Sequence, residues 1–369
     1  MTSSVDAGTA RAINANELDP YMAAAPGSER ELAWLSPRNA PFEVDGLGWY
    51  ATEGIYRRLP VNPDWPLPEA VDRLADATAG GQLRFRTDSA VLAVKVELAG
   101  PPNMNHMPAT GQCGVDAYVG EWGAQRYWGT ARPVLDSSDY TAIVFDVDAS
   151  EMRTVTLNLP LYQGVREVLI GVDPGAQVAA PPPFTAPGRI VVYGTSITQG
   201  GCATRPGMAW PGIVSRRLGQ EVLNLGFSGN GKGEPEVART LAQLDDVACF
   251  VLDYETNVAE AEDLRTTLTD FIPILRERHP ETPILVVSKP AFHREAHAER
   301  HRQARMARRD IQREIVERHR AAGDRHVHFL DQGDLDIAEG TVDGVHPSDL
   351  GFVQLADSIE PALREALAR

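Results

Sequence analysis

The stretch that decides the fold is Arg189-Ile-Val-Val-Tyr-Gly-Thr-Ser-Ile-Thr-Gln-Gly200, where an apolar run ends in a glycine turn that carries a serine. The β-branched residues 190–192 are typical of a strand that is buried on both faces, and the two glycines allow the backbone to turn sharply. Ser196 would then lie at the carboxyl end of a buried strand, where open α/β sheets bind ligands. An isolated serine of this kind more often only caps the following helix, so its role depends on residues further along the chain.

Downstream of this stretch, the pattern alternates between buried strands and amphipathic helices over residues 189–369. This alternation predicts an α/β fold, namely a three-layer α/β/α sandwich with a parallel, flavodoxin-like sheet. The strands are expected at 190–194, 222–225, 249–252, 284–287 and 327–330, and the helices near 208–219, 234–244, 260–278, 294–321 and 350–367.

Upstream of the stretch, residues 41–178 contain short alternating or apolar runs separated by turn residues, with little room for long helices. They predict an antiparallel β-sandwich, with strands near 83–87, 91–98, 140–147, 154–159 and 167–172. Residues 1–40 lack periodicity and are expected to form a loose arm. Residues 179–188 contain three consecutive prolines, so we expect a semi-rigid linker between two domains.

Composition excludes several classes of function. The chain has 369 residues, enough for two domains, and a formal charge of −16, which disfavours nucleic acid and anionic membranes as partners. The three cysteines, Cys113, Cys202 and Cys249, give neither a disulfide framework nor a CxxC metal pair. His106 lies between two methionines, which is no recognisable metal site. With no basic apolar leader and no run of 18 apolar residues, a cytoplasmic protein is expected.

A serine hydroxyl needs a base, and the segment Thr341-Val-Asp-Gly-Val-His-Pro347 after the last strand supplies one. The His346 imidazole titrates near neutral pH and could take the Ser196 proton. Asp343, three residues earlier, could accept a hydrogen bond from Nδ1–H and fix the tautomer. Pro347, at the first helical position, would place the histidine just ahead of a helix.

The turns after the second and third strands could stabilise an oxyanion. Gly226 could present a bare backbone N–H, and Asn257 could add a side-chain amide. Asn230, in the glycine-rich run 224–231, is the alternative amide donor.

These segments resemble the four blocks of the SGNH (GDSL-type) esterases and acyltransferases. The resemblance spans nearly all of residues 189–369, with Thr195 where the family has aspartate and with Val258 in place of the aspartate that usually follows Asn257. It implies an SGNH catalytic domain with Ser196 as nucleophile, His346 and Asp343 completing a triad, and an oxyanion hole formed by Ser196, Gly226 and Asn257. Gly114-Val-Asp-Ala-Tyr118 is similar to the Gly-x-Asp-Leu-Tyr signature of a β-sandwich that precedes this fold in a two-domain subgroup.

We therefore expect serine-dependent acyl chemistry on a small ester or thioester, with no metal and no cofactor. Hydrolysis by water is expected first, and transfer of the acyl group to the hydroxyl of a small natural product is the alternative, because both reactions use the same residues. A non-catalytic binding protein on the same scaffold is a more remote alternative, which the intact serine, histidine and aspartate disfavour.

Overall fold

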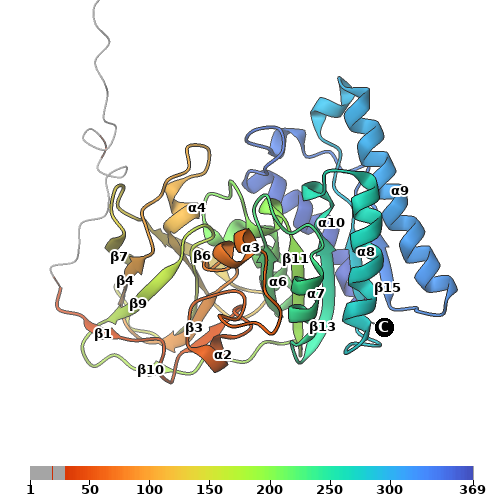
Figure 1. Ribbon diagram of the computed structural model, residues 1–369. Helices are drawn as coiled ribbons and strands as arrows, with labels where there is room; N and C mark the ends of the chain where they lie inside the picture. Colours follow the sequence, from red (N-terminus) through yellow and green to blue (C-terminus); the bar gives the residue numbers. More distant parts are fainter. Residues whose placement is uncertain (1–18, 20–29, 369) are drawn as a thin grey trace, which may run out of the picture.

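The computed structural model describes residue 19 and residues 30–368, and it has a strand-rich part beside an α/β part (Figure 1). Most of the expected N-terminal arm lies outside the described residues. Within its last part, β1 (Ala33–Leu35) pairs with β9 (Val165–Val172) and is the first strand of the strand-rich part.

The strand-rich part consists of two antiparallel sheets with strand orders β1-β9-β4-β7 and β10-β3-β8-β5-β6, and β2 pairs with β3. In β4 (Val91–Leu98), the alternate side chains Leu92, Val94 and Val96 are fully buried, as period-two alternation requires. The antiparallel sandwich is therefore confirmed. Its other strands are β2 (Glu43–Asp45), β3 (Gln82–Thr87), β5 (Val115–Val119), β6 (Arg126–Ala131), β7 (Asp139–Asp146), β8 (Arg153–Asn158) and β10 (Val178–Ala179). Three short helices accompany them: α2 (Tyr50–Glu53), α3 (Glu69–Leu74) and α4 (Ala109–Cys113).

The α/β part contains one parallel sheet with the strand order β12-β11-β13-β14-β15. Along β11, Val191 and Tyr193 pack into one core with helices α7, α8 and α9, whereas Ile190 and Val192 pack into another with α6 and α10. Helices thus cover both faces, and the three-layer α/β fold is confirmed (Figure 1). The strands are β11 (Arg189–Gly194), β12 (Glu221–Gly226), β13 (Val247–Asp253), β14 (Ile284–Val287) and β15 (Val327–Leu330).

The long helices are α6 (Trp210–Leu218), α7 (Pro235–Ala242), α8 (Ala261–Arg276), α9 (Glu299–Ala321) and α10 (Asp349–Leu367). Short helical turns are α5 (Ser196–Gln199), η1 (Pro206–Met208), η2 (Glu255–Asn257), η3 (His293–Ala296) and η4 (Ala338–Gly340). The helix expected over 294–321 is thus divided into η3 and α9, because Ala298 leaves the helical region with φ −142° and ψ 87°. Among the described residues, no helix is long and apolar enough to cross a membrane.

The segment 179–188 is fixed to both parts of the molecule. The indole N–H of Trp122, on the sandwich side, donates to Pro183 O at 3.0 Å, and its ring stacks on Phe184. On the α/β side, Thr185 N–H donates to Gly219 O at 2.8 Å. The proline-rich segment is therefore anchored along its length.

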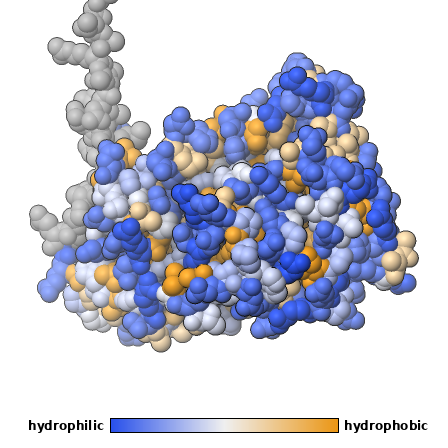
Figure 2. All heavy atoms as spheres, viewed as in Figure 1, coloured by the Kyte–Doolittle hydropathy of each residue, from blue (hydrophilic) through white to orange (hydrophobic). Residues whose placement is uncertain are grey.

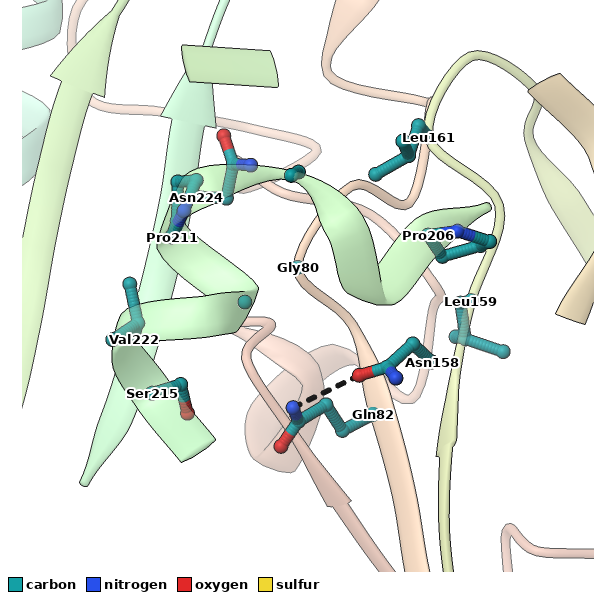
Figure 3. Close-up of a pocket in the computed structure, with 12 residues that line it drawn as sticks. Gly80, Gln82, Asn158, Leu159, Leu161, Pro206, Pro211, Ser215, Val222 and Asn224 are labelled. Atoms are coloured by element: carbon teal, nitrogen blue, oxygen red, sulfur yellow. Dashed lines mark hydrogen bonds between the residues drawn. The ribbon is translucent and has the colours of Figure 1, made fainter. Parts of the chain in front are cut away.

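Asp116, from the Gly114–Tyr118 signature, joins the two parts. Its fully buried carboxylate accepts hydrogen bonds from Arg205 (2.8 Å) and Gly207 N–H (2.9 Å) across the interface, and from Asn158 (2.8 Å) within the sandwich. Figure 3 shows a small cavity beside these contacts, with Gln82 bonded to Asn158. The signature thus has a physical role, because Asp116 holds the segment that follows the serine turn.

Candidate active site

The turn after β11 presents Ser196 at the carboxyl end of the strand, as predicted. Thr195 caps α5 by accepting a hydrogen bond from Ile197 N–H at 3.2 Å. A side chain at Gly194 would meet Thr198 Oγ1 at 2.0 Å and Asp253 O at 2.9 Å, so only glycine fits there. The serine is 7% exposed and is held in a closely packed turn.

Ser196, His346 and Asp343 form one chain of hydrogen bonds, although 150 residues separate the serine from the histidine. Ser196 Oγ lies 2.9 Å from His346 Nε2, and His346 Nδ1 lies 2.7 Å from Asp343 Oδ2. In this arrangement the histidine can take the proton of the serine hydroxyl, and the aspartate fixes the tautomer of the histidine.

The turn around Gly344 (φ +83°) brings Asp343 back onto His346. Asp343 Oδ1 accepts from the backbone N–H groups of Val345 (3.0 Å) and His346 (2.8 Å). Partial burial opposes ionisation of this carboxyl, but the hydrogen bonds from the His346 backbone, the His346 ring and the Val345 backbone outweigh it and lower the pKa of Asp343 to about 2. The carboxylate is therefore charged near neutral pH.

Gly226, which we predicted as an oxyanion donor, has an N–H that is already hydrogen-bonded. Its N–H already donates to Asn224 Oδ1 at 3.1 Å. A Cβ at this glycine would lie 2.2 Å from Gln199 N and 2.7 Å from Thr195 O, so the residue is enclosed by backbone. The acceptor of the Gly226 backbone N–H is therefore the side-chain oxygen of Asn224, a contact that sequence reasoning did not consider.

Gly229, three residues later in the same glycine-rich run, has the properties that Gly226 lacks. It is in the left-handed region with φ +65°, and the space where a Cβ would stand is open. Within the described part of the chain, its N–H has no recorded acceptor. The neighbouring Ser228 N–H donates to Gln199 Oε1 at 3.0 Å, which fixes this loop against the serine turn.

The two asparagines that we considered as amide donors both contact this loop. Asn257, at the end of η2, donates to Phe227 O at 3.2 Å and also to Asn230 O. Asn230 donates to Ser228 O at 3.0 Å, within its own turn. Asn257 thus bridges the third strand and the loop after the second, whereas Asn230 only stabilises a local turn.

A network of buried polar side chains holds the serine turn in place. Gln199 Nε2 donates to Leu161 O at 3.0 Å in the sandwich part. Asn224 Nδ2 donates to Thr198 O at 2.8 Å, and Thr198 Oγ1 donates to Asp253 Oδ2 at 2.7 Å. The ends of three neighbouring strands are thus tied to the serine turn.

The sandwich part contributes two side chains beside the site that sequence reasoning did not place there. Tyr162 OH donates to Ser196 O at 3.3 Å. The His106 ring packs edge to face on the His346 ring, with 5.9 Å between the centroids. His106, Cys202 and His346 are also the described residues that could together hold a metal ion.

Comparison with known proteins agrees with this architecture. Residues 188–364 match the GDSL-like lipase/acylhydrolase family, and residues 32–178 match the GxDLY N-terminus of SGNH-type esterases. A crystal structure from Bacteroides ovatus, described as a GDSL-like lipase, is 30% identical, with 92% of this chain and 98% of that chain covered and a TM-score of 0.84. The chain belongs to the GDSL-like lipase/acylhydrolase family.

Other solved structures share the fold of this GDSL-like enzyme. The salicylyl-acyltransferase SsfX3 from a tetracycline biosynthetic pathway is 23% identical, with 90% of this chain and 97% of that chain covered and a TM-score of 0.71. A family two carbohydrate esterase from Clostridium thermocellum is 16% identical, with 79% and 93% covered and a TM-score of 0.58. No curated protein matches the chain.

Proposed function

We propose that this GDSL-like enzyme hydrolyses small carboxylic esters with Ser196 as nucleophile, His346 as general base and Asp343 as the residue that orients it. The observation that carries this proposal is the chain of two short hydrogen bonds, 2.9 Å and 2.7 Å, from Ser196 Oγ through His346 to Asp343. Membership of the esterase family makes an ester the expected class of substrate.

In the first step, Ser196 Oγ attacks the ester carbonyl while His346 Nε2 takes the hydroxyl proton. The tetrahedral intermediate then collapses, the C–O bond to the alcohol breaks, and the imidazolium gives its proton to the leaving alkoxide. In the second step, His346 removes a proton from water, the hydroxide attacks the acyl-serine, and the acid leaves as Ser196 recovers its proton. Asp343 stabilises the imidazolium in both steps.

For the oxyanion we propose the backbone N–H groups of Ser196 and Gly229. This assignment replaces Gly226, whose N–H is occupied, and rests on the open space at Gly229 and on the loop contact between Ser228 and Gln199. The Asn257 amide is the third donor in this proposal, and it must turn from a loop carbonyl towards the substrate when an oxyanion forms.

We assign residues 41–178, together with β1, as an accessory domain, 179–188 as the linker and 189–369 as the catalytic domain. The accessory side contributes Tyr162 to the site. The three cysteines are buried and free, which is consistent with the expected reducing cytoplasm.

Acyl transfer to an alcohol is the second candidate. It is favoured by the similarity of both parts of the chain to a salicylyl-acyltransferase over 90% of this chain. The donor would be an ester or thioester, and the acceptor would be the hydroxyl of a small molecule in place of water.

Hydrolysis of p-nitrophenyl acetate, butyrate and benzoate, with and without an added alcohol, tests these two proposals. Release of p-nitrophenol with equal formation of the acid would support esterase activity. Ester formation that exceeds acid release would favour the acyltransferase, and the absence of any p-nitrophenol release would argue against both.

A further inference from the structure

A thiol and two imidazoles from separate segments meet beside the proposed triad. His106 belongs to the loop between β4 and α4 in the sandwich, Cys202 follows the serine helix α5, and His346 is the proposed base. The ligand atoms of all three side chains lie within 4.8 Å of one another. The neighbours of His106 in the sequence gave no recognisable metal site, because Cys202 and His346 lie about 100 and 240 residues away along the chain.

The spacing is close to what a tetrahedral metal ion requires. Nitrogen and sulfur ligands of one zinc ion lie roughly 3.3–3.7 Å apart, given their usual bond lengths. Ligand atoms within 4.8 Å of one another can therefore converge through small side-chain rotations. His106 is exposed, and among the described residues such a rotation would break only its surface contact with Asn105 Oδ1, which lies 3.2 Å from His106 Nδ1, whereas the Cys202 thiol is buried.

The loop that carries His106 is fixed by a single buried side chain. Gln112 Oε1 accepts from Asn103 N–H (2.9 Å) and Met104 N–H (3.0 Å), and its Nε2 donates to Met104 O (3.2 Å) and Met107 O (2.7 Å). The backbone of the loop is therefore held in place while the imidazole at its tip can adjust. This arrangement presents His106 to the other two ligands at little entropic cost.

We propose that His106, Cys202 and His346 form an inhibitory binding site for Zn²⁺, which closes the active site reversibly. The inference rests on the proposed function, because it assigns regulation to the same histidine. Two imidazoles and one thiolate are ligands that zinc prefers, and a water molecule completes the fourth position. On binding, the Cys202 thiol releases its proton to solvent, and no redox change occurs.

Charge around the site favours a cation. The Asp343 carboxylate is hydrogen-bonded to His346, one of the three ligands. Burial and the same carboxylate raise the pKa of the Cys202 thiol to about 11, so the thiol is neutral until a metal ion displaces its proton. The chain as a whole carries a formal charge of −16, which raises the local concentration of cations.

Zinc binding and catalysis exclude each other at His346. The metal would bind either His346 Nε2, which accepts the Ser196 proton, or His346 Nδ1, which is hydrogen-bonded to Asp343. Either mode breaks one of the two hydrogen bonds of the triad. A chelator should restore activity fully, since nothing covalent is altered.

The test measures binding and activity separately. Calorimetric titration with Zn²⁺ is run on the wild type, Ser196→Ala, His106→Asn and Cys202→Ser, with melting curves to verify folding. Wild type and Ser196→Ala should bind equally, whereas each ligand variant should bind at least about ten- to a hundredfold more weakly, as loss of even a supporting group weakens metal sites by that much. Titration with Co²⁺ should produce a thiolate charge-transfer absorption that Cys202→Ser lacks.

Activity gives the second readout. Zn²⁺ should inhibit the wild type, and EDTA should reverse the inhibition. His106→Asn should require a correspondingly higher Zn²⁺ concentration for the same fractional loss of its own metal-free activity. His297→Asn is the matched control, because His297 is an exposed histidine that packs against His293 instead. It should leave zinc inhibition unchanged.

Equal zinc affinity in the wild type and His106→Asn, or relief of inhibition by His297→Asn, would overturn the proposal. The two proposals fail separately. Zinc binding that depends on His106 in a protein without esterase activity would reject only the proposed function, and ester hydrolysis that is insensitive to Zn²⁺ would reject only the metal site.

Discussion

At the scale of single residues, the proposed activity depends on how Asp343 and His346 are held. The pKa of Asp343, lowered to about 2, keeps this side chain ionised, so a loss of activity on mild acidification cannot come from its protonation. The hydrogen bonds that Asp343 accepts from two backbone N–H groups also fix its orientation toward the imidazole.

Asp343→Asn is expected to lower kcat on p-nitrophenyl acetate on the order of a thousand- to ten-thousandfold, because an amide would favour the wrong imidazole tautomer. The fold should survive, since Asp343 lies at the surface. Steady-state kinetics and a melting curve check both statements. An unchanged kcat would show that Asp343 does not orient the base.

Comparison of two asparagines tests the oxyanion proposal. Asn257→Ala should reduce kcat roughly a hundred- to a thousandfold, as expected for loss of one oxyanion donor, with little change in KM. Asn230→Ala should have a much smaller effect, because its amide donates only to Ser228 O in its own turn. The reverse order in steady-state kinetics would transfer the role to Asn230.

At the scale of elements, the end of β12 and the loop after it depend on one buried cation. Arg58, 1% exposed, donates to four carbonyl oxygens, of which Asn224 O and Gly226 O belong to β12 and Leu74 O and Ala77 O to the sandwich side. Arg58 thereby connects the end of β12, which lies beside the serine turn, to the segment that contains Leu74 and Ala77.

Arg58→Met should lower the free energy of unfolding by about 3 kcal/mol or more, because several buried carbonyls lose their donor and each such loss costs about 1–3 kcal/mol. Denaturant unfolding measures the change. Arg86→Met is a suitable control, since Arg86 is exposed and, among the described residues, donates one hydrogen bond, to Ala180 O. An equal change in the free energy of unfolding for the two variants would show that the Arg58 hydrogen bonds do not stabilise the fold.

Glu255 in η2 should make stability depend on pH. Burial raises the pKa of this carboxyl from 4.5 to about 8, and Lys289 and Arg308 only partly oppose the rise, to which Asp253 adds. The folded protein therefore binds a proton that the unfolded chain has lost, so stability should fall between about pH 4.5 and pH 8.

Glu255→Gln should remove this contribution. Melting temperatures measured from pH 5 to pH 9 should decline less steeply for the variant than for the wild type. Parallel curves would show that Glu255 is ionised in the folded state throughout.

The sequence was sufficient for the strands but not for every site residue. β11 to β15 were predictable because their runs of apolar, β-branched residues match strands buried on both faces. Our proposal of Gly229 in place of Gly226 could not have come from the sequence, since only the position of the Asn224 side chain reveals that the Gly226 N–H is occupied. Tyr162 and His106 approach the site through contacts between the two parts, which no local pattern reports.

At the scale of the whole molecule, the two parts are joined by buried polar contacts and not by the linker alone. The face shown in Figure 2 is mostly hydrophilic, with apolar residues in small groups. The carboxylate of Asp116 accepts two of these polar contacts across the interface, from Arg205 and from Gly207 N–H.

Asp116→Ala should destabilise the protein by about 3–5 kcal/mol, because it leaves Arg205 without its carboxylate partner and the buried Gly207 N–H without its acceptor. Thermal unfolding should then separate into two transitions, one for each part. Asp148→Ala, which removes an exposed carboxylate of the sandwich, should leave a single transition. A single, unshifted transition for Asp116→Ala would show that the interface does not depend on this residue.

The most direct test of the proposed function is to locate the residue that a fluorophosphonate probe modifies. Mass spectrometry of the labelled wild type should place the adduct on Ser196, and Ser196→Ala should neither be labelled nor release p-nitrophenol. An adduct on another residue, or ester hydrolysis that persists in Ser196→Ala, would contradict the assignment of Ser196 as the nucleophile.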